Sequence, residues 1–201
     1  MIKRALLTLF TFVVFTAVGN TAEWNLDAVH SSVGFSVRHL VVSKVKGNFD
    51  KFSGSANFDE KNLAAGSVEF TVEVGTVDTD NEKRDEHLKS ADFFDAEKFP
   101  MMTFKSTKVT NVEGNKFNLE GELTIKDVTK PVVFECEFNG TVNDPWGNTK
   151  AGFSAETTIN RQDFNITWSK AIETGGLVVS DEVAIEIDTE WNMAKAEEAK
   201  N

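Results

Sequence analysis

Three histidines and a single cysteine are the residues of this chain best suited to catalysis or metal binding. His30, His39 and His87 form no H-x-x-H or H-E-x-x-H motif, and one cysteine cannot build a structural zinc site. His30 and His39 lie nine residues apart on one predicted strand, so they should point to opposite faces about 30 Å apart. No G-x-S-x-G elbow, P-loop or dinucleotide fingerprint occurs. The sequence therefore predicts a protein that is not an enzyme and has no metal site or resident cofactor.

The charge of the chain and the setting of its cysteine narrow the choice further. With 21 basic and 32 acidic residues the formal charge is −11, and this negative field repels phosphate backbones, so no nucleic-acid partner is expected. Cys136 lies in an alternating segment between Glu135 and Glu137, which would not stabilise a thiolate. We expect a buried, inert thiol.

The first 22 residues predict a secretory signal peptide. Lys3 and Arg4 precede an apolar run from Ala5 to Val18. This run is shorter than the roughly 20 residues that cross a bilayer, so an uncleaved anchor is the less favoured alternative. Cleavage is expected after Ala22, with Gly19 as the alternative position. The mature protein would then be exported to the periplasm or secreted, without a membrane-spanning segment.

Apolar and polar residues alternate with a period of two through most of the remaining chain. The segments 33–39, 67–74, 117–125, 132–142, 151–159 and 183–191 show this alternation, and two further strands are expected within 45–58 and 102–109. Turn signals occur at Gly114-Asn115, Asp127–Pro131 and Asn143–Asn148, and links this short favour antiparallel neighbours. We therefore predict an all-β fold, an eight-stranded antiparallel up-and-down barrel with one or two short helices in its connections.

Two segments interrupt the alternation, 80–100 and 161–180. In the first, Asp80 or Asn81 could cap a short helix over residues 82–89. The stretch Arg84–Asp95 is charged at its start and aromatic at its end. It predicts either a lid that closes one end of the barrel and meets a polar head group, or a capped helix whose Phe93 and Phe94 complete the core.

Each predicted strand has one charged face and one apolar face. Carboxylates are costly to bury in a narrow barrel, so the charged faces are expected in water and the apolar faces inside. Several small residues also fall on inward faces, namely Gly54, Ala56, Gly121, Ala151 and Ala155. Small residues among phenylalanines fit a packed core or a hollow lumen, and the spacing leaves this choice open.

The stretches Asp27–His39, Val45–Phe49, Phe52–Gly54, Arg84–Asp95, Phe99–Pro100, Gly121–Val132 and Val179–Ile185 occur in this order along the chain. Together they resemble the YceI family of exported, lipocalin-like polyisoprenoid-binding proteins. The resemblance implies a barrel over residues 23–192 with a long apolar cavity for an isoprenoid quinone, a polyprenyl phosphate or a fatty-acid-like amphiphile. It also implies a periplasmic or secreted location, frequent homodimers and no catalysis. Residues 193–201 would form a charged C-terminal tail.

Under this interpretation two sets of residues are predicted to contact the ligand. The first set would line the lumen around an apolar tail and comprises Phe35, Val37, Phe70, Val72, Phe104, Leu119, Leu123, Phe134, Phe138 and Phe153. The second set would meet a head group at a barrel mouth and comprises His39, Arg84, His87 and Lys89.

Two other classes of function stay open. A packed barrel without a lipid ligand could be a structural or interaction protein that acts in the periplasmic stress response and meets a basic partner through its acidic face. An exported hydrolase could use His30 or His87 with a neighbouring Asp, although the sequence offers no evident nucleophile. Lipid that purifies with the protein would favour binding, whereas a turnover lost on substituting either histidine would favour the hydrolase.

Overall fold

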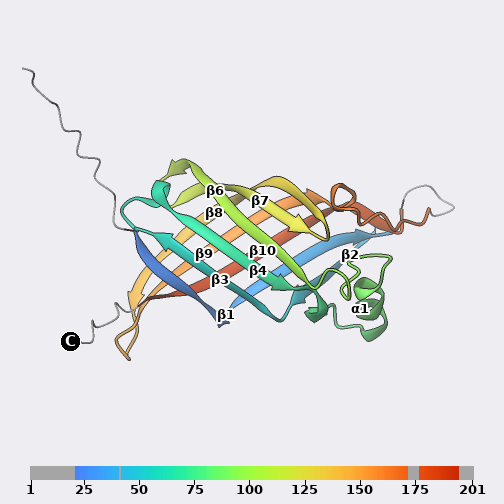
Figure 1. The fold of residues 1–201 in the computed structure, drawn as a ribbon, viewed down its shortest axis with the longest axis horizontal. Helices are drawn as coiled ribbons and strands as arrows, with labels where there is room; N and C mark the ends of the chain where they lie inside the picture. The colour runs from blue at the N-terminus through green and yellow to red at the C-terminus, as the bar shows by residue number, and fades with distance from the viewer. Residues whose placement is uncertain (1–20, 41, 172–176, 195–201) are drawn as a thin grey trace, which may run out of the picture.

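The computed structural model describes residues 21–40, 42–171 and 177–194, which form an elongated β-barrel (Figure 1). Among these residues, no helix is long and apolar enough to cross a membrane. The strands are β1 (Ala22–His39), β2 (Ser43–Phe49), β3 (Phe52–Phe58), β4 (Ser67–Glu73), β5 (Val77–Asp78), β6 (Met101–Glu113), β7 (Lys116–Ile125), β8 (Val128–Asn143), β9 (Thr149–Asn160) and β10 (Val179–Met193). The α-helix α1 spans Glu82–Lys89, and 3-10 turns lie at Leu63–Ala65, Val74–Thr76 and Arg161–Phe164.

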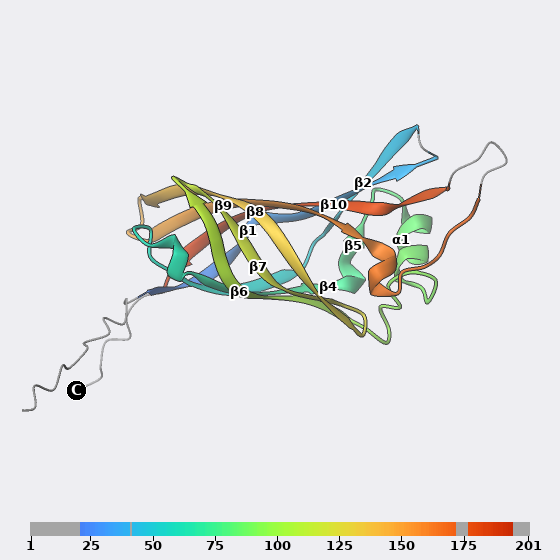
Figure 2. The same ribbon diagram turned by 90° about the horizontal axis from the view of Figure 1, so that it is seen from above.

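Eight of these strands close the barrel, which confirms the predicted fold. Their order around the ring is β1-β3-β4-β6-β7-β8-β9-β10, and β10 pairs back with β1; every pairing is antiparallel. β1 pairs with three strands. On one edge, Ala22–Asn25 pairs with β3 and Gly34–His39 pairs with β2; on the other edge, β10 pairs with most of the strand. β2 and β5 therefore extend the sheet beyond the closed ring, at the end that carries α1 (Figure 2).

Several boundaries differ from the sequence prediction. The strand expected within 45–58 is divided into β2 and β3 around Asp50 and Lys51, because β2 leaves the ring. β1 begins at Ala22, well before the predicted start, and its register with β10 shifts between Asp27 and Ser32, where the alternation slips. The turn expected over Asp127–Pro131 consists of Lys126 and Asp127 alone. The predicted signal peptide (1–22) and the predicted C-terminal tail (193–201) lie almost entirely outside the described residues.

The predicted helix forms, and its N-cap is Asn81. The Asn81 side chain accepts a hydrogen bond from the backbone N–H of Arg84 at 3.0 Å, which satisfies one of the free donors of the first turn. The buried Asp85 carboxylate accepts hydrogen bonds from the backbone and the hydroxyl of Thr79. Arg84 donates to the Thr79 hydroxyl and carbonyl oxygens, both at 2.7 Å. These contacts tie α1 to Thr79, just after β5, by polar bonds, and Leu88 of α1 packs against the apolar core.

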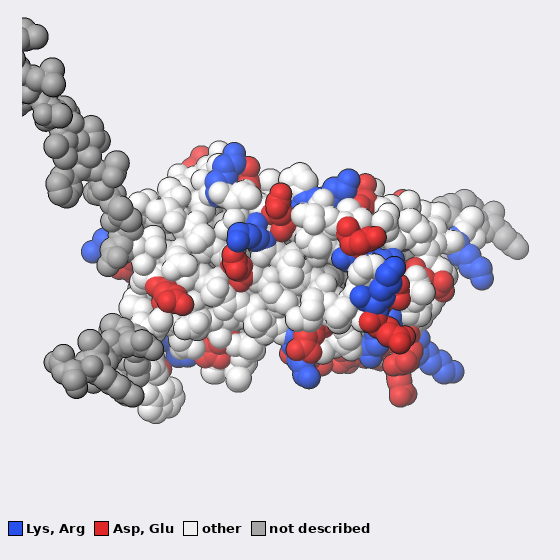
Figure 3. All heavy atoms as spheres, in the orientation of Figure 1, with Lys and Arg blue, Asp and Glu red and all other residues white. Residues whose placement is uncertain are grey.

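Charged side chains lie on the outside of the barrel, as the alternation predicts, and Figure 3 shows residues of both signs scattered over one face. Cross-strand ion pairs join β4 to β6 through Glu69 and Lys105 at 2.6 Å, and β6 to β7 through Lys108 and Glu120 at 3.1 Å. Phenylalanine and aliphatic side chains fill the inner face. The sheet thus separates an exterior that carries charged residues from an apolar interior.

Candidate functional site

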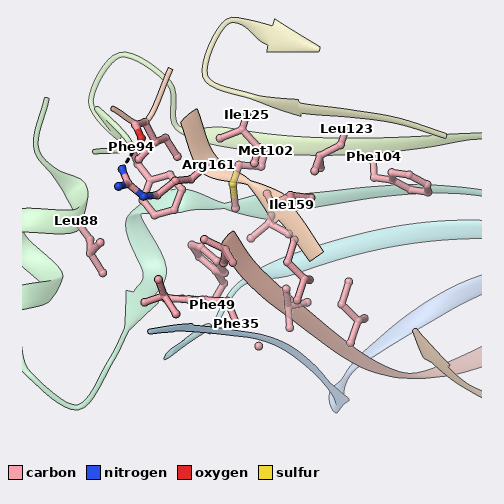
Figure 4. Close-up of a pocket in the computed structure, with 18 of the residues that line it drawn as sticks. Phe35, Phe49, Leu88, Phe94, Met102, Phe104, Leu123, Ile125, Ile159 and Arg161 are labelled. Carbon is pink, nitrogen blue, oxygen red and sulfur yellow. Dashed lines mark hydrogen bonds between the residues drawn. The ribbon is translucent and has the colours of Figure 1, made fainter. Parts of the chain in front are cut away.

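The interior of the barrel contains two apolar cavities. The α1-side cavity, of about 150 Å³, lies between the strands, Leu88 of α1, and Phe93 and Phe94 of the segment after α1 (Figure 4). The far cavity, of about 130 Å³, lies toward the opposite end and is bounded by Phe58, Leu63 and other apolar side chains. The lumen is therefore partly hollow, which answers the choice that the sequence left open.

A partition separates the two cavities. Four residues line both of them: Phe70, Phe104, Phe134 and Ile187, from β4, β6, β8 and β10. The rings of Phe104 and Phe134 meet edge to face, with centroids 5.1 Å apart and planes at 78°. Phe70 and Phe104 are register partners on the neighbouring strands β4 and β6, whereas Phe134 and Ile187 come from β8 and β10. These four side chains lie between the two cavities and divide the lumen.

Gly121 on β7 provides the space that the partition needs. A Cβ at this position would lie 2.4 Å from the Phe104 ring and 2.6 Å from the Lys105 carbonyl oxygen. Real Cβ atoms do not approach so closely, so the ring of Phe104 can lie against β7 only because residue 121 lacks a side chain. Gly121 was predicted as a small inward residue, and the structure shows which ring it accommodates.

The far end of the barrel is closed mainly by side chains of the ring strands. Trp24 of β1 stacks on Phe58 of β3, with centroids 4.4 Å apart and planes at 10°, and its Nε1 donates to the Phe58 carbonyl at 3.4 Å. Trp191 of β10 is also buried there. Leu63, from the connection between β3 and β4, packs in the same half of the lumen, near Phe117. This closure is part of the sheet itself.

The α1 end is closed by connections between strands. Phe93 and Phe94 reach into the lumen from the segment after α1. Outside them, the His87 ring packs edge-on against Phe93 and Trp168, with centroids 5.0 and 5.3 Å away. His87 Nε2 is 3.0 Å from a carboxylate oxygen of Asp92. Phe93 and Phe94 thus close this end of the barrel, as both interpretations of Arg84–Asp95 expect, and Trp168 of a second connection completes the closure.

Arg161 anchors this second connection, and sequence analysis did not single it out. Its side chain is only 3% exposed, and its aliphatic stem lines the α1-side cavity (Figure 4). The guanidinium donates to the carbonyls of Ile166, Trp168, Val179 and Ser180 at 2.7 to 3.4 Å, and to the Asp181 carboxylate at 2.9 Å. Desolvation on burial lowers the pKa of Arg161, while the charge of Asp181 acts in the opposite direction. The only feature of the sequence that could have pointed to Arg161 is its position, at the start of the segment 161–180 that interrupts the alternation.

Nine of the ten residues predicted to line the lumen border a cavity. Phe35, Val37, Phe70, Val72, Phe104, Leu123 and Phe134 line the α1-side cavity, and Phe70, Phe104, Leu119, Phe134 and Phe153 line the far cavity. Phe138 borders neither; its ring packs on Phe153 and Phe58, with centroids 5.0 and 6.4 Å away. Phe138 is thus part of the packing at the far end. Contact of any of these residues with a ligand stays a prediction.

The residues predicted to meet a head group gather around the α1 end but line neither cavity. Arg84 is bonded to Thr79, and His87 is packed as described above. Lys89 Nζ lies 3.6 Å from a Glu86 carboxylate oxygen. His39 ends β1 opposite Ser43 and Val179. Their role as head-group ligands stays a prediction.

A polar cluster outside the lumen joins three strands at the β1 irregularity. Lys150 Nζ lies 2.8 Å from an Asp27 carboxylate oxygen and 2.7 Å from one of Glu190, and His30 Nδ1 is 3.1 Å from Asp27. The hydrogen bond from Lys150 holds the pKa of Asp27 well below its usual range, and the bond to Asp27 raises the pKa of Lys150. Although Asp27, His30 and Glu190 are spaced as metal ligands could be, the lysine ammonium already supplies a cation to both carboxylates.

Two His–Asp pairs bear on the hydrolase alternative. His30 pairs with Asp27, and His87 pairs with Asp92. The nearest serine hydroxyls in the chain, Ser31 and Ser90, donate instead to backbone carbonyls. No hydroxyl or thiol within the described ranges bonds to either imidazole, so neither pair has the contact that activates a nucleophile.

Cys136 is buried beside the far cavity, as predicted. Desolvation raises the pKa of its thiol to about 12. The Sγ donates to the Phe134 carbonyl oxygen at 3.7 Å. A thiol with this pKa is almost fully protonated at neutral pH and is a poor nucleophile.

An eight-stranded antiparallel ring of strands around a divided apolar lumen defines this molecule as a small up-and-down β-barrel. The model of the YceI-like domain matches residues 24–191, and the chain belongs to the YceI family. It is 43% identical over 149 residues to a UPF0312 protein of Vibrio campbellii, which covers 73% of this chain and 79% of that protein. It is also 43% identical over 162 residues to Protein YceI of Salmonella newport, covering 80% and 84%.

Solved structures show the same fold. BcnA of Burkholderia cenocepacia aligns with a TM-score of 0.73 at 27% identity, covering 82% of this chain and 98% of that one. The YCEI protein of Campylobacter jejuni aligns with a TM-score of 0.68 at 36% identity, covering 85% and 97%. A polyisoprenoid-binding domain from Saccharophagus degradans aligns with a TM-score of 0.61 at 15% identity, covering 87% and 99%, which is a likeness of fold alone.

Proposed function

We propose that this protein is an exported carrier that binds a long-chain isoprenoid lipid, of the isoprenoid quinone or polyprenyl phosphate class, in its barrel lumen. The observation that carries the proposal is the pair of apolar cavities in line along a barrel whose outer face is charged. A cavity lined by Phe, Val, Leu and Ile offers nothing to a polar ligand but accepts an apolar tail. The name of the Saccharophagus domain supports an isoprenoid as the tail.

Burial of apolar surface would supply the binding free energy. Each 100 Å² of tail removed from water contributes about 2.5 kcal/mol, so a tail with a few hundred Å² of surface binds even after the loss of its conformational freedom. A lumen of this composition selects by length and shape rather than by hydrogen bonds. The packed-barrel alternative is less well supported, because it expects no such hollow.

The division of the lumen favours a long tail that uses both cavities. Sites for small molecules commonly measure about 300–1,000 Å³, and the cavities of about 150 and 130 Å³ are each well below this range. A tail that fills both must pass the partition at Phe104 and Phe134. Rotation of the Phe104 side chain about χ1 would open that passage without moving the strands.

The tail would enter at the α1 end. That end is closed by connections held by polar bonds, which can open locally without breaking the ring of strands. A head group left at this mouth would lie near His39, Arg84, His87 and Lys89. A phosphate or a quinone oxygen could be recognised there by charge or by hydrogen bonds.

The test is native mass spectrometry of protein purified from the periplasm, followed by organic extraction of the bound material. The expected result is a bound species of several hundred daltons that extracts as an isoprenoid, on a polypeptide shortened by its signal peptide. The same spectra would show whether the protein is a homodimer. A clean apo mass, with no uptake of added isoprenoid quinone or polyprenyl phosphate, would overturn the proposal and favour a structural or interaction role.

A pair of variants separates binding in the lumen from binding at the surface. Ile185 of β10 is half-buried and lines the α1-side cavity, whereas Val133 of β8 is 45% exposed on the outer face. Ile185→Trp should fill the cavity and abolish uptake, and Val133→Trp should leave uptake unchanged. Equal uptake by the two variants would place the lipid elsewhere.

A further inference from the structure

The β1–β2 hairpin differs in charge from the rest of the molecule. No Asp or Glu occurs from Ala28 to Phe49, although the whole chain has 32 acidic residues and a formal charge of −11. Arg38, Lys44 and Lys46 lie in this stretch and are exposed. The hairpin is therefore a local basic patch on an acidic protein.

The basic side chains of the hairpin are placed against one another. Arg38 and Lys44 are directly opposite in the antiparallel register, and Lys46 is two residues further along β2, opposite Ser36. Like charges in directly opposite positions destabilise a sheet. Within the described ranges, no carboxylate lies in ion-pair distance of these three groups. The fold thus keeps a repulsive arrangement that an external anion would relieve.

The same hairpin exposes apolar side chains at its tip. Val42 is 84% exposed and Leu40 is 37% exposed, and both are within four residues of a basic side chain. Basic groups beside exposed apolar groups are typical of segments that bind at the interface of an anionic bilayer. The opposite end of the barrel also exposes an apolar residue, Trp146, but its turn contains Asp144 and no basic residue.

The position of the hairpin connects it with the mouth of the lumen. Figure 2 shows it projecting beyond the barrel at the end that carries α1. Within the hairpin, Val37 lines the α1-side cavity and pairs with Val45 of β2 and Val183 of β10. A surface that holds the tip would therefore hold the α1 end of the lumen close to itself.

We propose that the tip of the β1–β2 hairpin docks on the surface of an anionic phospholipid bilayer, with Arg38, Lys44 and Lys46 at the phosphates and Val42 in the interfacial layer. The negative body of the barrel does not prevent this docking. Fields are screened over about 8 Å at physiological ionic strength, and the hairpin projects from the body. Docking requires no cargo, so it can be tested on lipid-free protein.

The experiment measures co-sedimentation of the full mature protein, after delipidation, with vesicles of phosphatidylglycerol in phosphatidylcholine and with vesicles of phosphatidylcholine alone. We expect binding to the anionic vesicles only, weakened by added salt. Each lysine near an anionic surface contributes about fivefold in affinity, so Lys44→Gln with Lys46→Gln should weaken binding by about thirtyfold. Val42→Asp should weaken binding by removing the apolar contact.

A matched double variant controls for net charge. Lys61→Gln with Lys116→Gln makes the same change of charge on exposed residues of the connection after β3 and the start of β7, and it should leave vesicle binding unchanged. Unfolding curves of all variants show whether each one folds. No binding to anionic vesicles, equal binding to neutral vesicles, or equal loss in the two double variants would overturn docking of the hairpin on a bilayer. Failure to find a bound isoprenoid would not overturn the docking proposal, because the vesicle assay uses lipid-free protein.

Discussion

The two ends of the barrel are closed by different kinds of structure. At the far end, Trp24 and Phe58 stack on the paired strands β1 and β3, so the closing rings belong to the sheet itself. At the α1 end, the closing side chains belong to connections that Thr79, Asp85 and Arg161 hold by hydrogen bonds. Core strands open at free energies close to that of global unfolding, whereas connections between strands can open locally at a lower free energy. The difference teaches which end can admit a ligand while the barrel stays folded.

The largest effect is expected from Arg161→Ala, which removes the tether of the second connection. Four backbone carbonyls and the Asp181 carboxylate would lose a buried charged donor. We expect a loss of about 3–5 kcal/mol in the free energy of unfolding, measured by urea denaturation. Arg84→Ala, at the same end but bonded to Thr79 alone, should cost about 1–2 kcal/mol. Equal losses of unfolding free energy in the two variants would mean that Arg161 is not the main tether of the α1 end.

Phe104→Ala tests whether the two cavities act as one site. Removing the ring should join the cavities, cost about 3 kcal/mol, and shift the extracted lipids toward longer or bulkier tails. Phe138→Ala is the matched control, since it removes a ring that borders neither cavity. Mass spectrometry of the extracted lipid gives the tail lengths. The partition would have no role in selection if both variants carried the same lipids as the unmodified protein.

Phe94→Ala and Leu63→Ala compare the two ends directly. Each truncates one apolar side chain that borders a cavity, and each should cost about 2 kcal/mol of stability. Only Phe94→Ala should speed the release of a bound fluorescent isoprenoid. If the closed state loses about 1.4 kcal/mol of stability relative to the open state, release should be roughly tenfold faster. Stopped-flow release measures this rate. Faster release from Leu63→Ala alone would reverse the assignment of the open end.

The smallest effect is expected from acid, through a cluster that belongs to neither end. The pKa of Asp27 is held below its ordinary value of 3.8, mainly by the hydrogen bond from Lys150. A carboxyl with a lowered folded-state pKa stabilises the fold above its unfolded pKa, and this contribution is lost as the pH falls through the folded value. The protein should thus lose stability below about pH 4 more steeply than Asp27→Asn does.

The control for the acid experiment is Asp188→Asn, which removes an exposed carboxylate of β10 near the same cluster. This variant should follow the acid response of the unmodified protein in thermal unfolding at pH 7 and below pH 4. Release of a bound isoprenoid should not change in either variant, because the cluster lies outside the lumen. Identical acid curves for Asp27→Asn and the unmodified protein would contradict the role given to the Asp27–Lys150 pair.

The alternation of residues predicted the barrel and its polarity, because period two reports which face of a strand is buried. The interruption of this pattern, together with a cap at Asp80 or Asn81, predicted α1, and Asn81 is the cap in the structure. The alternation did not predict that Phe138 packs away from the cavities. It indicates whether a side chain faces the interior or the exterior, but not where along the lumen the side chain lies. The partition was equally hidden, since Phe104 and Phe134 meet only after distant strands are assembled.

Arg161 illustrates a second limit of the sequence. Four of its five acceptors are backbone carbonyls, which every residue carries, so no pattern of side chains marks them. The break of β1 at Asp27–Ser32 is similar, because the slip in alternation is filled by hydrogen bonds of Ser31 to the Asp27 carbonyl and from the Glu190 backbone. At both positions the local structure is determined by tertiary hydrogen bonds that involve the main chain.

The pairing of β1 with β10 sets the time at which the barrel can be completed. Trp24 pairs with Met193, so the ring joins the first and the last strands of the described chain. Contacts of such long range are formed late and at a high cost in chain entropy. A polypeptide with this connectivity cannot assemble its barrel while it is still being synthesised, because the final strand emerges last.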